Sequence, residues 1–577
     1  MKNININNIK YYCFTYNRQN TSKKSLEPIG LDTEAYTTGE CFMIATSEGD
    51  VFRPEDFPAC LFSRTYRGKH FVCYNLKYDS GAMLQGLPIE NLEQLRSKDK
   101  TVYDGFTYSA IGYKSLTIRR GKNSVHFWDM LNFYQMRLEA AATLYLDSHK
   151  LDETVSMYTK SYVLENWVQI SRYCVQDADL VRRLAEVIIK RFESYGVYPK
   201  KLYSVAYISY QYFRTHTPYV TVKKYWEKHK DLLQYALYAY AGGKFEVTQK
   251  GPGYYYEYDI VSAYPAEIRN LVDISWARVV KSSKYRRESV YGFLHVAVDI
   301  PFDLHTSTIC KRHGVNVYAV GQYETYCTKQ EYEYLTASGA DVSIIEGYWI
   351  HVDNKQYPYR KEIDRLTELK HQFKKDGKEL DYHTVKILMN SLYGKFVQLI
   401  KTGEGWKASS CWNPIYAAVI TANCRIKVSN WQTIYNTITA VHTDSVISTA
   451  PLPFGKTGGI GELIYETEGE GVVLGAGIYE IGEKIKFRGY HGSLLLTELI
   501  RASNTKLQLT YEHAYTWREV AFRGWDSSKI NLFEELPKVI NINFDQKRLW
   551  IDDWKNWREV LNRTVESYPL IYSKALF

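Results

Sequence analysis

The segment AVHTDSVIS, at residues 440–448, has the pattern of a catalytic turn. Apolar and β-branched residues run up to Asp444 and its polar neighbours and resume after them, which predicts a strand, a tight turn and a returning strand. An acidic side chain at such a turn could hold a divalent cation, but one carboxylate is rarely enough. Asp444 therefore needs a partner, and His442, two residues earlier, needs a role.

A candidate partner lies upstream in GPGYYYEYDIVSAYPAEIRN, residues 251–270. We expect its Gly-Pro-Gly start to break the preceding element, a β-rich run to reach Asp259, and Pro265 to end that run. Carboxylates on neighbouring strands suit Mg²⁺, which keeps several waters and takes its remaining ligands from phosphate oxygens. Each aspartate alone could equally be an ordinary turn-former at a strand end.

A third segment, DYHTVKILMNSLYGKF at residues 381–396, has apolar residues at helical spacing. On another face Lys386, Asn390 and Tyr393 follow at i, i+4 and i+7 and form one stripe. A cation, an amide and an aromatic ring on one stripe can hold phosphates and stack on a base. Gly394 is expected to allow a close backbone approach or to end the helix.

The segment before it, RKEIDRLTELKHQFKKDG, predicts a second amphipathic helix that ends near Lys374 and Lys375, before an Asp-Gly turn. Its inward residues would be Ile363, Leu366, Leu369 and Phe373. Two antiparallel helices with lysines near one end would form a clamp for a triphosphate.

Three further pairs of residues lie in the first two hundred positions and include four acids. Asp32 and Glu34 in IGLDTEAY are one residue apart, so on a strand both carboxylates share a face. The other pairs are Asn75 with Asp79 in NLKYDSGAML, and Tyr173 with Asp177 in YCVQDADLV. Four acids could hold two metal ions that activate a water and stabilise a departing oxygen.

In their order along the chain, these segments resemble the motifs of family B DNA polymerases. DIVSAYP resembles motif A, KILMNSLYG motif B and HTDS motif C, and the three upstream pairs resemble the motifs DxE, Nx₂(F/Y)D and Yx₃D of a proofreading 3′–5′ exonuclease. YAGG, at residues 240–243, resembles the YxGG element of the protein-primed branch, which links the exonuclease and polymerase domains and contacts the template. The resemblance covers about residues 28–490.

The resemblance implies a multidomain protein of the α/β and α+β classes, with an RNase H-like 3′–5′ exonuclease domain followed by a right-hand polymerase. The exonuclease domain would span residues 1–205 and the polymerase domain residues 206–577. The expected parts of the polymerase are a palm at about 235–280 and 400–490, an insertion that contacts a priming protein at about 281–350, fingers at about 355–397 and a thumb at about 491–577.

It also implies roles for particular residues. The polymerase metals would be held by Asp259, Asp444 and the backbone carbonyl of Ile260, and the exonuclease metals by Asp32, Glu34, Asp79 and Asp177, with Tyr173 orienting the attacking water. The nucleotide would contact Tyr264, Lys374, Lys386, Asn390 and Tyr393, with Tyr264 under the sugar to exclude a 2′-hydroxyl. DNA would contact Asn75, Tyr240, Gly242, Gly243, Ser391, Gly394, Tyr479 and Lys486. Supporting roles would fall to His442, Thr443 and Lys150.

The implied function is DNA-directed DNA synthesis with 3′–5′ proofreading, started on a terminal protein, in the replication of a linear viral or plasmid genome. Its cofactors would be two Mg²⁺ ions in each site, with Mn²⁺ as an alternative, and its partners template and primer DNA, dNTPs and the terminal protein. We expect a monomer in the host cytoplasm without membrane contact. The alternatives are a family B polymerase that uses nucleic-acid primers or primes itself, and a DNA-binding relic with a decayed polymerase site.

The sequence departs from the family pattern at three places. Motif C usually has aspartate where His442 stands; because histidine is a poor Mg²⁺ ligand, we expect it to hydrogen-bond Asp444 or a phosphate instead. Only 53 residues separate Asn390 from Asp444, which is short for the insertion linked to strand displacement and processivity. The KxY motif after motif C has Gly477 in place of lysine, so Lys486 is expected to replace it in primer binding.

Composition agrees with an intracellular nucleic-acid enzyme without proving one. The net charge of +9 suits a polyanionic partner, and the 52 tyrosines suit stacking on bases, although a low-GC codon bias would also enrich tyrosine. The nine cysteines include no CxxC pair, which favours a reducing compartment over zinc ribbons or disulfides. We expect no signal peptide and no membrane span.

Overall fold

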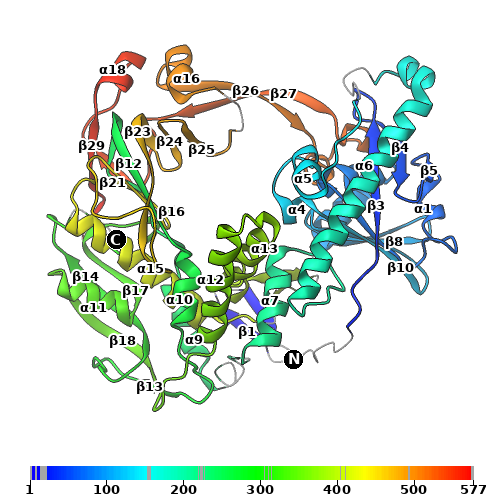
Figure 1. Cartoon of the computed structure of the whole chain (residues 1–577). Coiled ribbons are helices and arrows are strands. Elements are labelled where there is room, and N and C mark those ends of the chain that lie inside the picture. The colour runs from blue at the N-terminus through cyan, green and yellow to red at the C-terminus, as the bar shows by residue number, and fades with distance from the viewer. Residues whose placement is uncertain are drawn as a thin grey trace.

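The computed structural model shows two lobes joined by a ribbon at one side (Figure 1). The residues that it describes are 3–6, 9–12, 23–152, 158–218, 220, 222, 225, 228–304, 306–309, 311–313, 315–402, 405–409, 411–490 and 494–573. Within this part of the chain, no helix is both long and apolar enough to cross a membrane.

The N-terminal lobe is built on an eight-stranded sheet in the order β5-β4-β3-β6-β10-β9-β8-β7, in which β6 pairs in parallel with both β3 and β10. Its strands are β3 (Pro28–Ala35), β4 (Cys41–Thr46), β5 (Val51–Phe52), β6 (His70–Cys73), β7 (Lys100–Tyr103), β8 (Phe106–Ile111), β9 (Ser115–Arg120) and β10 (Asn123–Asp129). Its helices are α1 (Phe57–Cys60), α2 (Leu76–Leu84), α3 (Ile89–Lys98), α4 (Leu131–Tyr134), α5 (Leu138–Leu146) and α6 (Lys160–Ser194).

Helix α6 lies directly on the central strand β3. It starts at a side-chain cap, where Thr159 accepts a hydrogen bond from the N–H of Tyr162. A glycine on the strand permits the close approach, because a Cβ added at Gly30 would lie 1.7 Å from the carbonyl oxygen of Ala178. This packing brings the acids of the helix and those of the strand to the same place.

The other lobe contains a nine-stranded sheet whose main path is β11-β21-β22-β12-β23-β24-β25. Its strands are β11 (Phe245–Val247), β12 (Gln249–Ile260), β21 (Ile438–His442), β22 (Ser445–Ser448), β23 (Leu463–Gly475), β24 (Ile478–Ile481), β25 (Lys484–Phe487), β28 (Arg548–Trp550) and β29 (Val565–Pro569). Helices α10 (Ala263–Arg269) and α15 (Pro414–Ile434) pack against it through a shared core.

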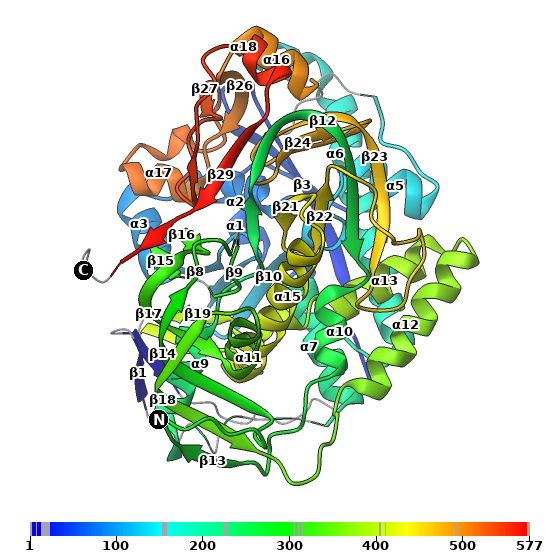
Figure 2. The ribbon, with the colours of Figure 1, turned by 90° about the vertical axis from the view of Figure 1, so that its left-hand side faces the viewer.

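Strand β12 corrects two of our expectations. Gly251-Pro252-Gly253 does not break the element but lies inside β12, which arches from β29 to β23 (Figure 2). Gly251 makes the bend possible, since its φ is +134° and a Cβ there would lie 2.7 Å from the Cα of Thr564. The strand ends at Ile260, and Pro265 lies in the first turn of α10, where proline is tolerated.

The helical part beside this sheet confirms one expectation and changes another. Helix α12 (Arg360–Lys375) is amphipathic as expected, with Ile363 and Leu366 fully buried. The helix expected at 381–396 is two helices, α13 (Glu379–Asn390) and α14 (Tyr393–Phe396). Asn390 and Ser391 lie at the break, and both residue types have a low helix propensity. Helices α7 (Val205–His216) and α9 (Lys230–Ala239) complete this part.

Residues 278–351 form a separate unit with its own core. A five-stranded sheet, in the order β13-β18-β14-β17-β30, packs with helix α11 (Lys329–Ala337). The strands are β13 (Arg278–Lys281), β14 (Tyr291–Ile300), β17 (Val320–Thr328), β18 (Asp341–His351) and β30 (Ile571–Tyr572), with the hairpin β15 (Lys311–His313) and β16 (Val315–Val317) beside them. Its range is close to that expected for the priming-protein insertion, whose role stays a prediction.

The short segment between the motif B helix and motif C gains strands from the N-terminus. It forms the hairpin β19 (Leu399–Thr402) and β20 (Gly405–Ala408), and β1 (Asn3–Ile6) and β2 (Ile9–Tyr12) extend it to a four-stranded sheet. The parallel pairing of β2 with β20 makes this connection. The N-terminal strands therefore enlarge a hairpin that the 53-residue interval alone keeps short.

The C-terminal segment belongs to both lobes. It contains α16 (Leu496–Ser503), β26 (Lys506–Ala514), α17 (Trp517–Arg523), the 3₁₀ helix η2 (Ser527–Lys529), β27 (Phe533–Asn541) and α18 (Trp557–Asn562). The β26–β27 ribbon starts in a core shared with β23 and β25 and crosses to the N-terminal lobe (Figure 1). There its tip enters the core of that lobe, so the range expected to be a thumb is not one compact unit.

Candidate active sites

The turn between β21 and β22 carries Asp444 at its tip, as the sequence predicts. Thr443 has a φ of +69°, which is unusual for a β-branched residue, and the N–H of Asp444 donates to the carbonyl of His442 at 2.9 Å. The N–H of Thr443 donates to the carbonyl of Lys244 at 2.6 Å. A Cβ at Gly243 would lie 2.4 Å from the Thr443 methyl, so this glycine makes room for the turn.

Asp259 lies beside Asp444 on the neighbouring strand. It pairs with Ser445, and the N–H of Ile260 donates to the carbonyl of Asp444 at 2.8 Å. Burial and the charge of Asp444 raise the pKa of Asp259 to about 7, and burial also raises the pKa of Asp444. Two half-buried carboxylates that resist ionisation together fit a site for a hard divalent cation.

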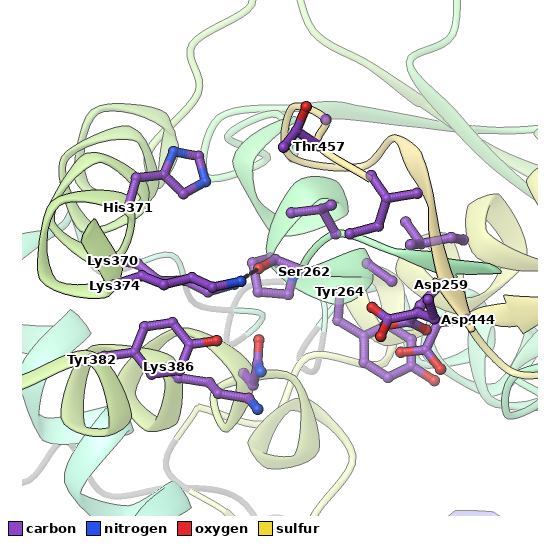
Figure 3. Close-up of a pocket in the computed structure, with 18 of the residues that line it drawn as sticks. Asp259, Ser262, Tyr264, Lys370, His371, Lys374, Tyr382, Lys386, Asp444 and Thr457 are labelled. Atoms are coloured by element: carbon purple, nitrogen blue, oxygen red, sulfur yellow. Dashed lines mark hydrogen bonds between the residues drawn. The ribbon is translucent and has the colours of Figure 1, made fainter. Parts of the chain in front are cut away.

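These aspartates open onto a cavity of about 770 Å³ that collects most of the predicted nucleotide-binding residues (Figure 3). Helices α12 and α13 contribute Lys374, Lys386 and Asn390, and α10 contributes Tyr264. Ile260, the predicted further ligand, lines the same cavity. Lysines on one side of the cavity and two acids on the other fit a triphosphate bridged by metal ions (Figure 3).

Lys370 is a cavity residue that the sequence analysis missed. Its Nζ donates to the Ser262 hydroxyl at 2.9 Å, and it lies one helical turn before Lys374 (Figure 3). Burial lowers the pKa of Lys370, and the charges of Lys386 and Lys374 lower it further. The i, i+4 spacing of two lysines in LKHQFKK was the signal that could have indicated it.

Glu466, on β23, is a second residue that we missed. It lines the same cavity as Asp259 and Asp444, and its charge contributes to the raised pKa of Asp259. The strand pattern gave no sign of this, because it depends on how β23 pairs with β12 across a bulge. The site therefore contains a third acid, even though motif C supplies only one.

Tyr393 packs against Tyr264, which lines the first cavity. Its ring stacks on that of Tyr264, with centroids 4.3 Å apart and planes 23° apart, and its hydroxyl is 2.8 Å from that of Tyr240. The three tyrosines link the YAGG segment to the nucleotide cavity. Ser391 and Gly394 lie at and just after the break between α13 and α14, and their predicted DNA contacts stay predictions.

The YAGG segment is held by a buried arginine that the sequence analysis also missed. Arg425, on α15, donates to the carbonyls of Ala241 at 2.6 Å and Gly242 at 2.9 Å. It also forms an ion pair of 2.6 Å with Glu331 of α11, and both side chains are almost completely buried. Arg425 thus connects the backbone of the YAGG segment to α11, and template contact by this segment stays a prediction.

The structure contradicts one of the two contacts that we expected of His442, the hydrogen bond to Asp444, and its contact with a phosphate stays a prediction. The side chain of His442 makes no hydrogen bond to Asp444; its Nε2 accepts one from the N–H of Gly477 at 3.2 Å, and its ring stacks on Tyr479 with centroids 5.1 Å apart. Burial lowers the pKa of His442 to about 4, so it is neutral at physiological pH. The reason is its place on β21, from which the side chain packs toward β24 and away from the turn.

Tyr479 and Lys486 border a second cavity, of about 810 Å³, that shares Asp259 and Asp444 with the first. Tyr479 is buried, and its hydroxyl donates to Glu257 at 2.8 Å, so its predicted DNA contact stays a prediction. Lys486 is exposed on β25. Gly477 occupies the position of the lysine in the KxY motif and lies in the turn between β23 and β24. Its φ is +76°, a conformation that favours glycine over lysine.

The second candidate site assembles all four predicted acids in the N-terminal lobe. Asp32 and Glu34 lie on β3, Asp79 on α2 and Asp177 on α6. Carboxylate oxygens of Asp32 and Glu34 and the sulfur of Cys174 all lie within 4.8 Å of one another. Burial raises the pKa of Asp32 to about 7, with the charge of Asp177 adding to it, and burial raises the pKa of Glu34 and Asp79 further.

Two carboxylate oxygens of this site could bind a cation. Oδ2 of Asp79 and Oδ1 of Asp177 are buried and make no hydrogen bond to described residues. Lys150 forms an ion pair of 2.5 Å with the other oxygen of Asp177 and lies over the Tyr173 ring, and its supporting role stays a prediction. Asn75 is exposed at the start of α2 with a φ of +78°, and its DNA contact stays a prediction.

Comparisons with known proteins show which proteins this chain resembles in sequence and in fold. A family model described as "DNA polymerase type B, organellar and viral" matches residues 147–410. A structure of Phi29 DNA polymerase with primer-template DNA superposes with a TM-score of 0.63 at 15% identity, covering 89% of this chain and 100% of that one. The fold is that of a family B DNA polymerase. The orthorhombic crystal form of Phi29 DNA polymerase gives a TM-score of 0.57 at 17% identity, covering 80% and 90%.

The family B fold confirms the expected fold class, with an exonuclease domain ahead of a right-hand polymerase. The chain resembles the organellar and viral type, and a Phi29 complex with incoming nucleotide substrates is also similar, with a TM-score of 0.61 at 14% identity, covering 90% and 99%. No curated protein sequence matched this chain.

Proposed function

We propose that the chain is a DNA-directed DNA polymerase. The observation that carries this proposal is the cavity that places Asp259 and Asp444 opposite three lysines of α12 and α13. Asp259 and Asp444 would hold two Mg²⁺ ions, which when bound supply Lewis acids for the primer 3′-hydroxyl and the leaving pyrophosphate. Mn²⁺, with its similar preference for oxygen, would also fit.

The residues of the chain would bind and orient the nucleotide. Lys370, Lys374 and Lys386 would neutralise the charge of the triphosphate. The ring of Tyr264, fixed by its stack on Tyr393, would lie under the sugar and exclude a 2′-hydroxyl. Lys486, on the rim of the second cavity, would hold the primer strand.

Extension of a primed template with dNTPs and Mg²⁺ tests this function. Asp444→Asn should abolish synthesis and preserve degradation of single strands, because the two groups of acids lie in different lobes. Synthesis within about tenfold of wild type, some 1.4 kcal/mol in activation free energy, would contradict the metal assignment. It would also revive the relic hypothesis, which the gathering of both sets of acids disfavours.

We also propose a 3′–5′ exonuclease in the N-terminal lobe. Asp32, Glu34, Asp79 and Asp177 would hold the metal ions that activate water there, and Lys150 would keep Asp177 ionised through their ion pair. Tyr173 would orient the water. The double change Asp32→Ala with Glu34→Ala should remove 3′–5′ degradation and raise misincorporation, whereas survival of degradation would refute this assignment.

Protein priming is the finer proposal for how synthesis starts, in the replication of a linear viral or plasmid genome. It is supported by the YAGG segment and by the separate unit at residues 278–351, which are joined through the Arg425–Glu331 ion pair. The alternative is a primer of nucleic acid. Transfer of a radiolabelled nucleotide to a protein, in a bond that survives denaturation, would support protein priming; labelling of nucleic acid alone would support the alternative.

A further inference from the structure

The tip of the C-terminal ribbon, residues 515–532, is packed as a part of the N-terminal lobe. Trp517, Val520 and Ile530 are fully buried in the same core as Leu76 and Leu84 of α2. The Tyr113 hydroxyl donates to Thr516 at 2.8 Å and adds a polar contact. More than three hundred residues of chain separate the tip from α6, the last helix of that lobe, yet the tip completes the lobe's core.

Asn531 joins this tip to the helix that carries an exonuclease acid. Its Nδ2 donates to the carbonyl of Tyr78 at 3.0 Å, and Tyr78 directly precedes Asp79 on α2. Asn531 is 2% exposed and has a φ of +63°, which asparagine tolerates better than most residues. Gly81 receives it, because a Cβ there would lie 2.5 Å from Oδ1 of Asn531.

Gln85, just after the same helix, makes a second connection. Its Nε2 donates to the carbonyl of Ile530 at 2.9 Å and to that of Gly39 at 2.6 Å. Its Oε1 accepts from the N–H of Cys41 at 2.8 Å. The tip is thereby fixed to α2 and to the turn between β3 and β4, and β3 carries the first two exonuclease acids.

The place of α2 decides where Asp79 points. Oδ1 of Asp79 accepts from the Thr33 hydroxyl at 2.8 Å, and Oδ2 is left for a cation. We propose that residues 515–532 are a positioning element of the exonuclease centre, with Asn531 holding α2 and thereby Asp79. This inference rests on the proposed exonuclease function. Proofreading would then depend on a ribbon whose other end lies beside the second cavity, the one that contains Asp259 and Asp444. There Lys538 of β27 donates to the carbonyl of Gly489 at 2.6 Å.

Asn531→Gly tests the inference with little backbone strain, because glycine accepts the positive φ and only the side chain is lost. Exonuclease kcat on single-stranded DNA should fall about fivefold, the scale of one neutral hydrogen bond, with KM unchanged. The Mg²⁺ concentration for half-maximal degradation should rise several-fold, while polymerase kcat and its Mg²⁺ dependence stay within about twofold. Lys529→Ala, an exposed change in the same tip, is the matched control and should change none of these.

Gly81→Ala tests the same contact from the helix side. Its added methyl group would lie 2.5 Å from Oδ1 of Asn531 and 2.9 Å from a methyl group of Ile530, so exonuclease kcat should fall. The fall should be smaller in the Asn531→Gly background, where only the Ile530 contact remains. Independent effects of the two changes would overturn the contact as the cause.

The outcomes separate this inference from the function on which it rests. If the wild-type chain shows no degradation that Asp32→Ala removes, the proposed exonuclease function fails. If the wild type degrades DNA and Asn531→Gly keeps both kcat and the Mg²⁺ midpoint within twofold, only the positioning role fails. A parallel loss of polymerase and exonuclease activity would show general destabilisation and would also overturn it.

Discussion

Asp259 should make metal binding at the polymerase site depend on pH near neutrality. Burial, with the charges of Asp444 and Glu466, raises the pKa of Asp259 to about 7 from its usual 3.8. Metal binding requires the ionised form. The ionised fraction should rise from about one tenth at pH 6 to about nine tenths at pH 8, so the apparent affinity for Mg²⁺ should rise about tenfold, or roughly 1.4 kcal/mol.

Calorimetric titration with Mg²⁺ at pH 6, 7 and 8 measures this effect. The Asp32→Asn, Asp177→Asn background removes two of the four acids of the second candidate site, which would otherwise bind metal over the same range. Asp444→Asn in that background removes a charge that raises the pKa of Asp259. This variant should bind Mg²⁺ more weakly, and the pH range over which its affinity rises should shift to lower pH. An affinity that differs less than twofold between pH 6 and 8 would refute the reasoning.

Thermal unfolding provides a second reading of the same group. The folded-state pKa of Asp259 lies above its unfolded value of 3.8, so ionisation lowers stability as the pH rises from about 4 to about 7. Mg²⁺ binds the ionised form in the folded state and should offset this loss. The rise in Tm on adding Mg²⁺ should therefore be larger at pH 8 than at pH 6, and an equal rise at both would contradict it.

Three further predictions concern the cavity and motif C. Lys370→Ala should raise KM for dNTPs about tenfold in steady-state assays, whereas the control Lys361→Ala, on the outer face of α12, should change KM little. An equal change of KM in both variants would exclude a triphosphate contact of Lys370. Tyr264→Val should lower the dNTP-to-rNTP incorporation ratio, and an unchanged ratio would make Tyr264 a packing residue. His442→Ala should cost about 2 kcal/mol of stability by leaving the Gly477 N–H unpaired, but it should not alter the pH–rate profile between pH 5.5 and 7.5, because His442 is already neutral there.

The sequence by itself determined the chemistry-bearing residues and the elements that carry them. Asp444 lies at a turn because β-branched residues flank it, and Asp32 and Glu34 share a face because strand periodicity is two. Helix α12 followed from its apolar spacing. These features depend on residues within one or two turns of each other, so local pattern was sufficient for them.

Tertiary structure decided whatever depends on distant packing. His442 looks like a catalytic neighbour of Asp444 in the sequence, but the pairing of β23 with β24 brings Tyr479 and Gly477 to it and buries it as a neutral ring. Glu466 joins the site only through the register of β12 with β23.

The same holds for the bends and junctions of the chain. Gly251 reads as a breaker, yet a sheet neighbour on each side keeps β12 continuous through the bend. The local sequence around Asn531 gives no sign of its partner, yet its side chain donates a hydrogen bond to the carbonyl of Tyr78 on α2, more than four hundred residues upstream. Contacts at such separations cost chain entropy that only the collective burial of the two cores offsets, so no local pattern encodes them.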